Sequence, residues 1–210
     1  WLPNAELLVS PESCPPMPDT VIAVDCAASD RLGRLLPMAR AAQSFLVIDH
    51  HRSNPGFGDV QLIDPEVPAA GVLVAELLTR AGLPWTPEIA TDLYAAIASD
   101  TGGFRFAGTS SATHVLAADL LAKGVDPEAV GRQLFASRPL SVAQLAARTV
   151  ANAMVVPAVA DGKGALVALI SQADRAEFDV DYDDVESIIT DLAAITTTDV
   201  AVVAKQDDHG

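Results

Sequence analysis

The stretch Phe45-Leu46-Val47-Ile48-Asp49-His50-His51 decides the predicted fold. An unbroken apolar run leads directly into a carboxylate and two imidazoles. A continuous apolar run of this length is typical of a parallel strand that is covered on both faces of its sheet. An earlier run, Val21-Ile22-Ala23-Val24, has the same character and ends at Asp25. The sequence therefore predicts two parallel strands whose carboxyl ends carry polar side chains.

Helix-like segments separate and follow these strands. Residues 31–42 place leucines on one face, and Thr86-Pro87-Glu88 has the capping residue and the proline that begin a helix. Strands that alternate with helices are typical of an α/β protein with a parallel sheet. A short strand is expected at residues 60–63. Further helices are expected at residues 69–80, 86–99, 111–122, from 126 onward, and 140–152.

The pattern of apolar and polar residues changes near residue 150. We expect a first domain over residues 1–136, a connecting helix within 137–152, and a second, smaller α/β unit over 153–210. In that unit, residues 155–160 and 165–170 flank the turn Asp161-Gly162 and predict a hairpin. A helix at 182–194 and a strand at 199–204 are expected to follow.

Composition narrows the class of protein. The chain has 210 residues and a net charge of −15, and half of its residues are apolar. These values indicate a globular protein, and no apolar stretch approaches the roughly 20 residues that cross a membrane. A surface this acidic repels long DNA. A phosphate substrate would therefore need a local positive charge, such as a bound divalent metal ion. Cys14 and Cys26 form no disulfide framework, and a cytoplasmic location is expected.

Candidate ligands gather where ligands bind in open α/β sheets, beyond the carboxyl ends of the strands. Asp25 and Asp49-His50-His51 follow the two strands, and Asp100 opens the loop 101–105. Carboxylate and imidazole together suit Mn, Fe, Co or Zn. Adjacent residues of an extended chain point to opposite sides, so one histidine is expected to bind metal and the other to face substrate or a supporting group. Asp49 could orient an imidazole by accepting a hydrogen bond from the ring nitrogen that faces away from the metal.

Ordinary structural roles compete with this interpretation. An aspartate at a strand end is commonly a turn residue or a helix cap, and a lone histidine is commonly a surface or core residue. We expect such roles for five further residues. They are His114, His209, Asp64, Asp92 and Asp126.

At this point the sequence resembles the DHH phosphoesterase superfamily, and within it the bacterial nano-RNA phosphodiesterases. The match extends over roughly residues 20–135, and residues 150–210 are more loosely similar to the start of a DHHA1 domain. The resemblance implies a parallel-sheet, Rossmann-like DHH domain followed by part of a DHHA1-like domain. The motifs that carry it are Ile48-Asp49-His50-His51, Asp25 on the preceding strand, Ser53-Asn54, Phe57-Gly58, Ile63-Asp64-Pro65 and the loop from Ala98 to Phe106.

The resemblance also implies roles for the site residues. Asp25 matches a carboxylate that bridges two manganese-type ions, and His50 and Asp100 match ligands of one ion. Asp49 matches a supporting carboxylate, and His51 the imidazole beside the scissile phosphate. Arg105 matches a position that we assign to the substrate phosphate. The implied substrates are short RNA oligomers, phosphoadenosine phosphate and, in some relatives, cyclic dinucleotides, and a homodimer is implied as well.

Two family motifs have no match in the sequence. No histidine precedes Asp25, so the N-terminal His-x-x-x-Asp-x-Asp motif is missing, as is the C-terminal Gly-Gly-Gly-His motif. The expected explanation is that the chain is a fragment of a longer protein. Three alternatives stay open: a family II inorganic pyrophosphatase, a non-enzymatic nucleotide-binding module, and an α/β protein in which these residues are structural.

Overall fold

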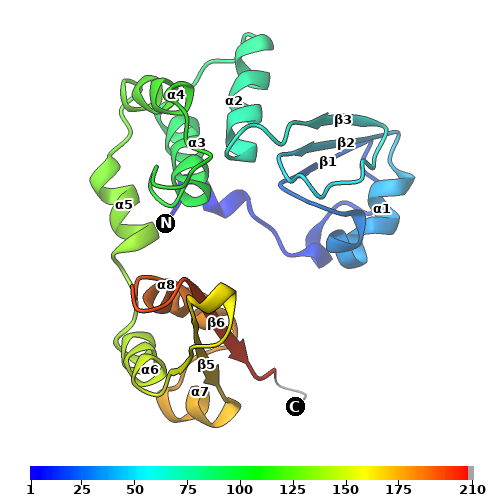
Figure 1. The fold of residues 1–210 in the computed structure, drawn as a ribbon. Helices are drawn as coiled ribbons and strands as arrows, with labels where there is room; N and C mark the ends of the chain where they lie inside the picture. Colours follow the sequence, from blue (N-terminus) through cyan, green and yellow to red (C-terminus); the bar gives the residue numbers. More distant parts are fainter. Residues whose placement is uncertain (208–210) are drawn as a thin grey trace. The chain divides into compact units, whose positions relative to one another are not determined.

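The structure is a computed structural model that describes residues 1–207, so His209 lies outside the described residues. The chain divides into two compact units, Trp1–Ala136 and Ser137–Gly210 (Figure 1). Among the described residues, no helix combines the length and the apolar character needed to cross a membrane.

The first unit is built on a parallel sheet of β1 (Thr20–Val24), β2 (Ser44–Asp49) and β3 (Val60–Ile63), in the order β1-β2-β3. Val24 pairs with Ile48 and Asp49 with Ile63, so all three strands run in register toward the same edge. The predicted α/β class with a parallel sheet is confirmed. Asp25 and the residues after β2 therefore leave the sheet at one edge.

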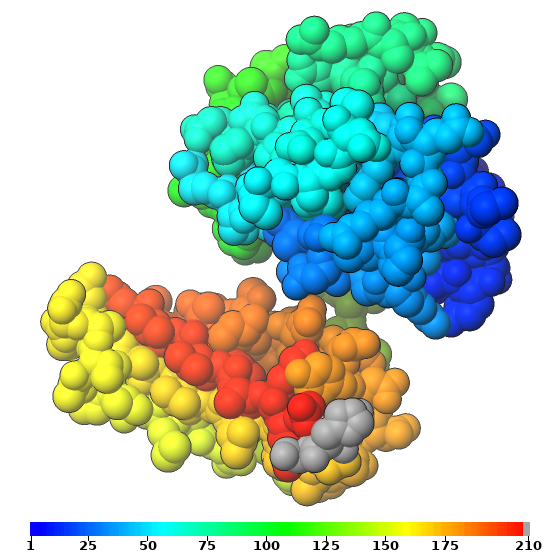
Figure 2. All heavy atoms as spheres, turned by 90° about the vertical axis from the view of Figure 1, so that its right-hand side faces the viewer, coloured from blue at the N-terminus to red at the C-terminus, as the bar shows by residue number. Residues whose placement is uncertain are grey.

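One face of this sheet packs on a small core. Ala23, Phe45 and Val47 are buried there together with Ala39 and Cys26. In the space-filling view, the blue and cyan residues of this region form one side of the first unit, with the green helices behind them (Figure 2).

The other face of the sheet is covered only at its centre. The expectation of a strand covered on both faces is confirmed for β2, where Ile48 is buried, and is wrong for β1 and β3. Ile22, Val24, Val60 and Leu62 lie on that face and are 51, 48, 57 and 37% exposed. The physical reason is that α2 (Ala70–Arg80) and α3 (Pro87–Asp100) pack mainly on each other, and α2 contacts the sheet through β2. Within residues 1–207, no helix contacts β1 or β3 extensively.

Local sequence explains how α3 begins. The Thr86 hydroxyl accepts a hydrogen bond from the Ile89 amide at 3.3 Å, and Pro87 is the first helical residue. The fixed φ of proline suits that position, so the predicted helix start is confirmed. The remaining helices of the unit are α4 (Ser111–Leu121) and α5 (Pro127–Phe135), and short 3-10 turns occupy Ala5–Leu7 and Pro11–Ser13.

The helix predicted at residues 31–42 is only partly correct. Residues Ser29–Leu35 form a 3-10 segment, and the α-helix α1 spans only Leu36–Ala41. Gly33 has φ 51° and ψ −126°, which interrupts helical geometry. Glycine tolerates this conformation, so the chain turns there instead of continuing one helix.

The second unit has its own sheet, with β5 (Ala165–Ile170) between β4 (Met154–Val156) and β6 (Val200–Lys205). β4 runs antiparallel to β5, as the predicted hairpin requires, and β6 runs parallel to β5. The helix expected as a connection, α6 (Leu140–Ala151), packs on β5 and on the helices of this unit. It is therefore part of the second unit.

Two helical segments of the second unit differ from expectation. α7 (Gln172–Phe178) was not expected, and the helix expected at 182–194 is reduced to a 3-10 turn at Asp183–Val185 and α8 (Ile188–Ala193). A Ser171–Asp174 capping box begins α7. That seven-residue helix is too short to give a clear apolar periodicity.

Candidate metal centre

Asp25 occupies an uncommon backbone conformation at the end of β1. Its φ is 56°, in the left-handed region that residues other than glycine enter infrequently. Its amide still donates to the Ile48 carbonyl at 2.9 Å, so the residue stays attached to β2. The carboxylate is 48% exposed. Backbone strain that is held in place by neighbouring hydrogen bonds is a feature of functional sites.

His50 lies between two carboxylates. Its Nε2 atom is 3.4 Å from Asp25 Oδ1 and 3.4 Å from Asp100 Oδ2. On the other side of the ring, Nδ1 faces the Val67 carbonyl oxygen at 3.4 Å. A proton on Nδ1 would leave the Nε2 lone pair directed at the carboxylates. This is the usual arrangement of a metal-binding histidine, whose far nitrogen is held by a backbone or carboxylate acceptor.

Asp49 is fully buried at the end of β2 and organises its neighbours. It accepts hydrogen bonds from His51 Nδ1 at 2.7 Å and from Asn54 Nδ2 at 2.6 Å. Burial by itself raises the pKa of Asp49. The bonds from His51, from Asn54 and from the amides of His51 and His50 together outweigh burial and hold that pKa below its ordinary value. Asp49 is therefore a charged residue that orients His51, and Asn54 is a contributor to this network whose role the sequence did not reveal.

The two histidines lie together, so the expectation that they point to opposite sides is wrong. Their ring centroids are 4.9 Å apart. Ligand atoms of Asp25, His50 and His51 all fall within 4.8 Å of one another. The reason is that β2 ends at Asp49, so the extended geometry behind that expectation no longer holds at residues 50 and 51.

Asp100 ends α3 and brings a second carboxylate to the site. Its pKa is raised, first by burial and then by the negative charge of Asp25, although His50 and His51 act in the opposite direction. Two carboxylates beside an imidazole Nε2 form an acidic pocket whose repulsion a cation would offset. The donor set of Asp25, His50 and Asp100 thus fits a divalent transition ion.

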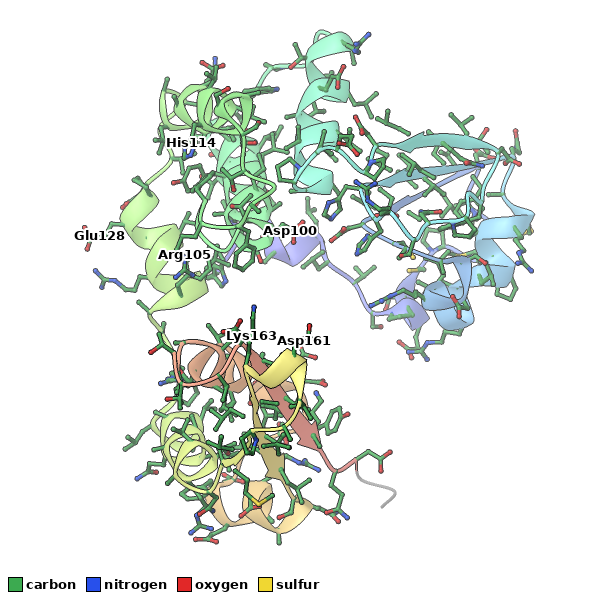
Figure 3. The ribbon with its side chains drawn as sticks, viewed as in Figure 1. Asp100, Arg105, His114, Glu128, Asp161 and Lys163 are labelled. Carbon is green, nitrogen blue, oxygen red and sulfur yellow. The ribbon has the colours of Figure 1, made fainter. Side chains whose placement is uncertain are left out.

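Arg105 lies outside this cluster. Figure 3 labels Asp100 and Arg105, which come from the end of α3 and from the loop that follows it. The Arg105 side chain is exposed, and its Nε donates to the Gly102 carbonyl at 2.5 Å. In the described part of the chain it is not bonded to Asp25, His50 or Asp100. His114, on α4, stacks near Phe104 at 5.5 Å between ring centroids and fits the ordinary role expected for it.

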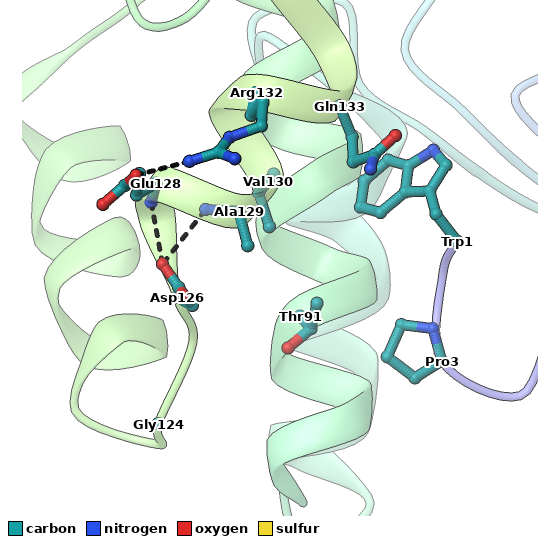
Figure 4. Close-up of a pocket in the computed structure, with 10 residues that line it drawn as sticks. All are labelled: Trp1, Pro3, Thr91, Gly124, Asp126, Glu128, Ala129, Val130, Arg132 and Gln133. Carbon is teal, nitrogen blue, oxygen red and sulfur yellow. Dashed lines mark hydrogen bonds and ion pairs between the residues drawn. The ribbon is translucent and has the colours of Figure 1, made fainter. Parts of the chain in front are cut away.

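Two cavities have very different linings. One of about 330 Å³ is bordered by Asp25, Asp92 and Asp100. In it Asp92 Oδ1 is buried without a hydrogen-bond partner among the described residues, and burial raises the pKa of Asp92. A cavity of about 580 Å³ lies between Trp1, α3 and α5 (Figure 4). The charged groups there have local structural roles, since Asp126 caps α5 as expected and Arg132 pairs with Glu128.

Comparison with curated proteins finds relatives that include two named as oligoribonucleases. The chain is 36% identical over 126 residues to the bifunctional oligoribonuclease and PAP phosphatase NrnA of Thermus thermophilus, a match that covers 60% of this chain and 37% of the relative. It is 29% identical over 167 residues to the probable NrnA of Streptococcus mutans, covering 79% of this chain and 52% of the relative. The chain thus spans about half the length of these relatives or less. No family model matches it.

Solved structures show the same architecture. An exopolyphosphatase-related protein from Bacteroides fragilis matches with a TM-score of 0.77 at 22% identity, covering 86% of this chain and 53% of that one. A putative family II inorganic pyrophosphatase of Methanococcus jannaschii matches with a TM-score of 0.50 at 17% identity, covering 90% and 64%. At these identities the likeness shows a shared fold. The sequence relatives and the shared fold support the resemblance to the DHH family of phosphoesterases that the strand-end motifs indicate.

Proposed function

We propose that the protein is a metal-dependent phosphoesterase that hydrolyses short RNA oligomers and small nucleotides such as phosphoadenosine phosphate, and cyclic dinucleotides as a further class. One observation carries the proposal: His50 Nε2 lies 3.4 Å from a carboxylate oxygen of both Asp25 and Asp100. The names of the NrnA relatives support the substrate class. A short substrate also suits a chain of net charge −15, because it needs no long basic track.

The proposed cofactor is a pair of divalent ions, with Mn(II) as the expected metal. Asp25, His50 and Asp100 would hold one ion, and Asp25 would be shared with the second. When bound, such ions supply Lewis-acid stabilisation of a phosphoryl group and acidify water. Asp25 and Asp100 supply the negative charge that retains them.

The other residues act on the substrate. His51, held by Asp49 at 2.7 Å, is proposed to give a proton from its second ring nitrogen to the leaving oxygen. The buried Asp49 accepts from Nδ1 of His51 and so fixes which ring nitrogen remains available to the substrate. Arg105 is proposed to bind phosphate oxygens through the part of its guanidinium that faces solvent.

The proposal also assigns a domain type to each of the two units. We assign residues 1–136 to a DHH domain that holds the metal centre, and residues 153–210, together with α6, to part of a DHHA1-like domain. A cytoplasmic location and a homodimeric state rest on the family resemblance and are proposed with them.

A direct test measures metal binding and turnover separately. Calorimetric titration of the intact protein with Mn(II) is expected to show binding that His50→Ala abolishes. His114→Ala, which changes a histidine on α4 outside the cluster, is the matched control and is expected to bind normally. The same three proteins are then assayed with a ribodinucleotide, phosphoadenosine phosphate and pyrophosphate.

Each result decides between the alternatives. Turnover of the dinucleotide and of phosphoadenosine phosphate, lost in His50→Ala, supports the proposal. Preference for pyrophosphate favours a pyrophosphatase, and Mn(II) binding without any turnover favours a nucleotide-binding module. Equal Mn(II) affinity in the wild type and His50→Ala would remove His50 from the site.

A further inference from the structure

Two exposed phenylalanines lie against the loop that follows Asp100. Phe106 is 59% exposed and Phe135 is 49% exposed. A Cβ atom added at Gly102 would lie 2.5 Å from the Phe106 ring, and one added at Gly103 would lie 3.4 Å from the Phe135 ring. Each ring therefore lies against one of two adjacent glycines. Large aromatic side chains left in water beside a polar site mark a ligand-binding surface.

The loop backbone holds Phe106 outward by a defined geometry. Gly102, Gly103 and Phe104 have φ values of 58, 71 and 65°. The buried Thr101 hydroxyl accepts from the Phe104 amide at 3.0 Å and donates to the Ile97 carbonyl at 2.6 Å. The Phe104 ring turns inward, with its centroid 5.6 Å from that of Tyr94. Phe104 thus anchors the loop, and Phe106 is left on the outside.

The Phe106 ring is close to the candidate metal centre along the chain. Gly102 is two residues from Asp100, so their Cα atoms are separated by at most about 7 Å. The Gly102 and Gly103 amides bond back to Ser99 at 3.0 Å and Ala98 at 2.7 Å, which folds the loop over the end of α3. The Arg105 guanidinium is tied to Gly102 as well. The Asp100 carboxylate at the end of α3 and the guanidinium and exposed ring of the following loop therefore belong to one short, ordered segment.

We propose that Phe106, flanked by Phe135, is the platform on which a nucleobase of the substrate stacks. The proposal rests on the proposed function, which supplies the nucleotide substrate. It adds a residue that recognises the base, beside Arg105, which is proposed to bind the phosphate. Stacking suits this protein because an aromatic face is uncharged, so the net charge of −15 does not oppose it. Every nucleobase has a π-face, so such a platform tolerates different sequences.

Binding measurements test the platform without requiring turnover. Calorimetry compares AMP with ribose 5-phosphate, which has the same phosphate and sugar but no base. The wild type is expected to bind AMP at least about fivefold more tightly, as expected for one stacked base. Phe106→Ala is expected to remove that preference while leaving the affinity for ribose 5-phosphate unchanged. Phe106→Tyr keeps a ring and is expected to restore the preference.

Further variants separate stacking from other effects. Leu83→Ala changes an exposed apolar residue of the same unit, 53% exposed, and is expected to have no effect. Arg105→Ala is expected to weaken both ligands, and that loss should shrink at high salt, whereas the Phe106→Ala loss should not. Phe135→Ala leaves residues 101–106 intact. It is expected to reduce the AMP preference even where Phe106→Ala disturbs the loop.

Several outcomes would overturn the platform. These are equal wild-type affinities for AMP and ribose 5-phosphate, equal losses for both ligands in Phe106→Ala, and failure of Phe106→Tyr to restore the preference. The proposed function has a separate outcome: a Phe106-dependent preference for AMP in a protein that hydrolyses no nucleotide would keep the platform and refute the esterase.

Discussion

Two carboxylates, one in each unit, have opposite environments. Asp174, just beyond β5, accepts hydrogen bonds from the Ser171 hydroxyl at 2.5 Å and the Ser171 amide at 3.1 Å. The Ser171 hydroxyl and then its amide lower the pKa of Asp174. Asp100, beside the tips of β1 and β2, is partly buried and faces Asp25, and burial followed by that charge raises the pKa of Asp100.

The difference separates an acid whose charge the fold satisfies from one that we propose as a metal ligand. Asp174 finds its donors within its own helix turn, so the fold satisfies its charge. Asp100 meets another carboxylate and an imidazole, so the fold leaves negative charge that an external cation can offset. Substitutions at Asp100, Asp49 and Asp174 test this contrast.

Asp100→Asn should give the largest effect. We expect the affinity for Mn(II) to fall by more than about 100-fold, because the loss of a supporting residue alone costs about 10–100-fold. The metal-free protein should become more stable, since the repulsion with Asp25 is removed. Thermal unfolding with and without Mn(II) measures both changes. A metal-free variant that melts below the wild type would show that Asp100 is a structural acid.

Asp49→Ala should give an intermediate effect on both stability and turnover. It leaves the donors of His51 and Asn54 without their buried acceptor, which costs about 1–3 kcal/mol in the free energy of unfolding. Turnover should fall about 10–100-fold because His51 loses its orientation. Urea unfolding and steady-state kinetics measure the two effects. Asp49→Asn keeps an acceptor oxygen, and it should retain more stability than Asp49→Ala if the hydrogen bonds are the cause.

Asp174→Asn should give the smallest effect, confined to stability. Asparagine keeps an acceptor oxygen but no charge, so the capping interaction is weakened at a cost of at most about 1 kcal/mol, with no change in Mn(II) affinity. Because the folded-state pKa of Asp174 is lowered, its stabilising contribution is complete above the ordinary aspartate pKa and is lost as pH falls through the folded value. The difference in unfolding free energy between the wild type and Asp174→Asn should therefore shrink on acidification. A difference that grows below pH 4 would contradict this assignment.

Much of the first unit could be predicted because its signals are local. The apolar runs before Asp25 and Asp49 indicated parallel strands, and the capping residues Thr86 and Asp126 marked helix starts. The register of β1 with β2 then brought Asp25 and His50 to one edge, as parallel strands require. Asp100 joins them from a helix end; the loop that follows it made this placement a candidate, and the family resemblance made the assignment specific.

What the sequence did not reveal depends on geometry between segments. The position of the second imidazole depends on where β2 stops, and a one-residue difference decides which way His51 points. The contact of Asn54 with Asp49 exists only once the loop after His51 has folded back. Which part of the sheet stays exposed depends on where α2 and α3 pack. The apolar run of a strand does not indicate the position of those helices. A local signal was available for α7, since Ser171 and Asp174 have the spacing of a capping box.

The left-handed backbone conformation of Asp25 lowers local stability at the position of a proposed metal ligand. Glycine adopts that conformation without a steric penalty, so Asp25→Gly would relieve the local strain. The same substitution would remove the carboxylate that faces His50. A redesign guided by conformational energy alone would therefore favour a more stable protein that lacks one of the proposed metal ligands.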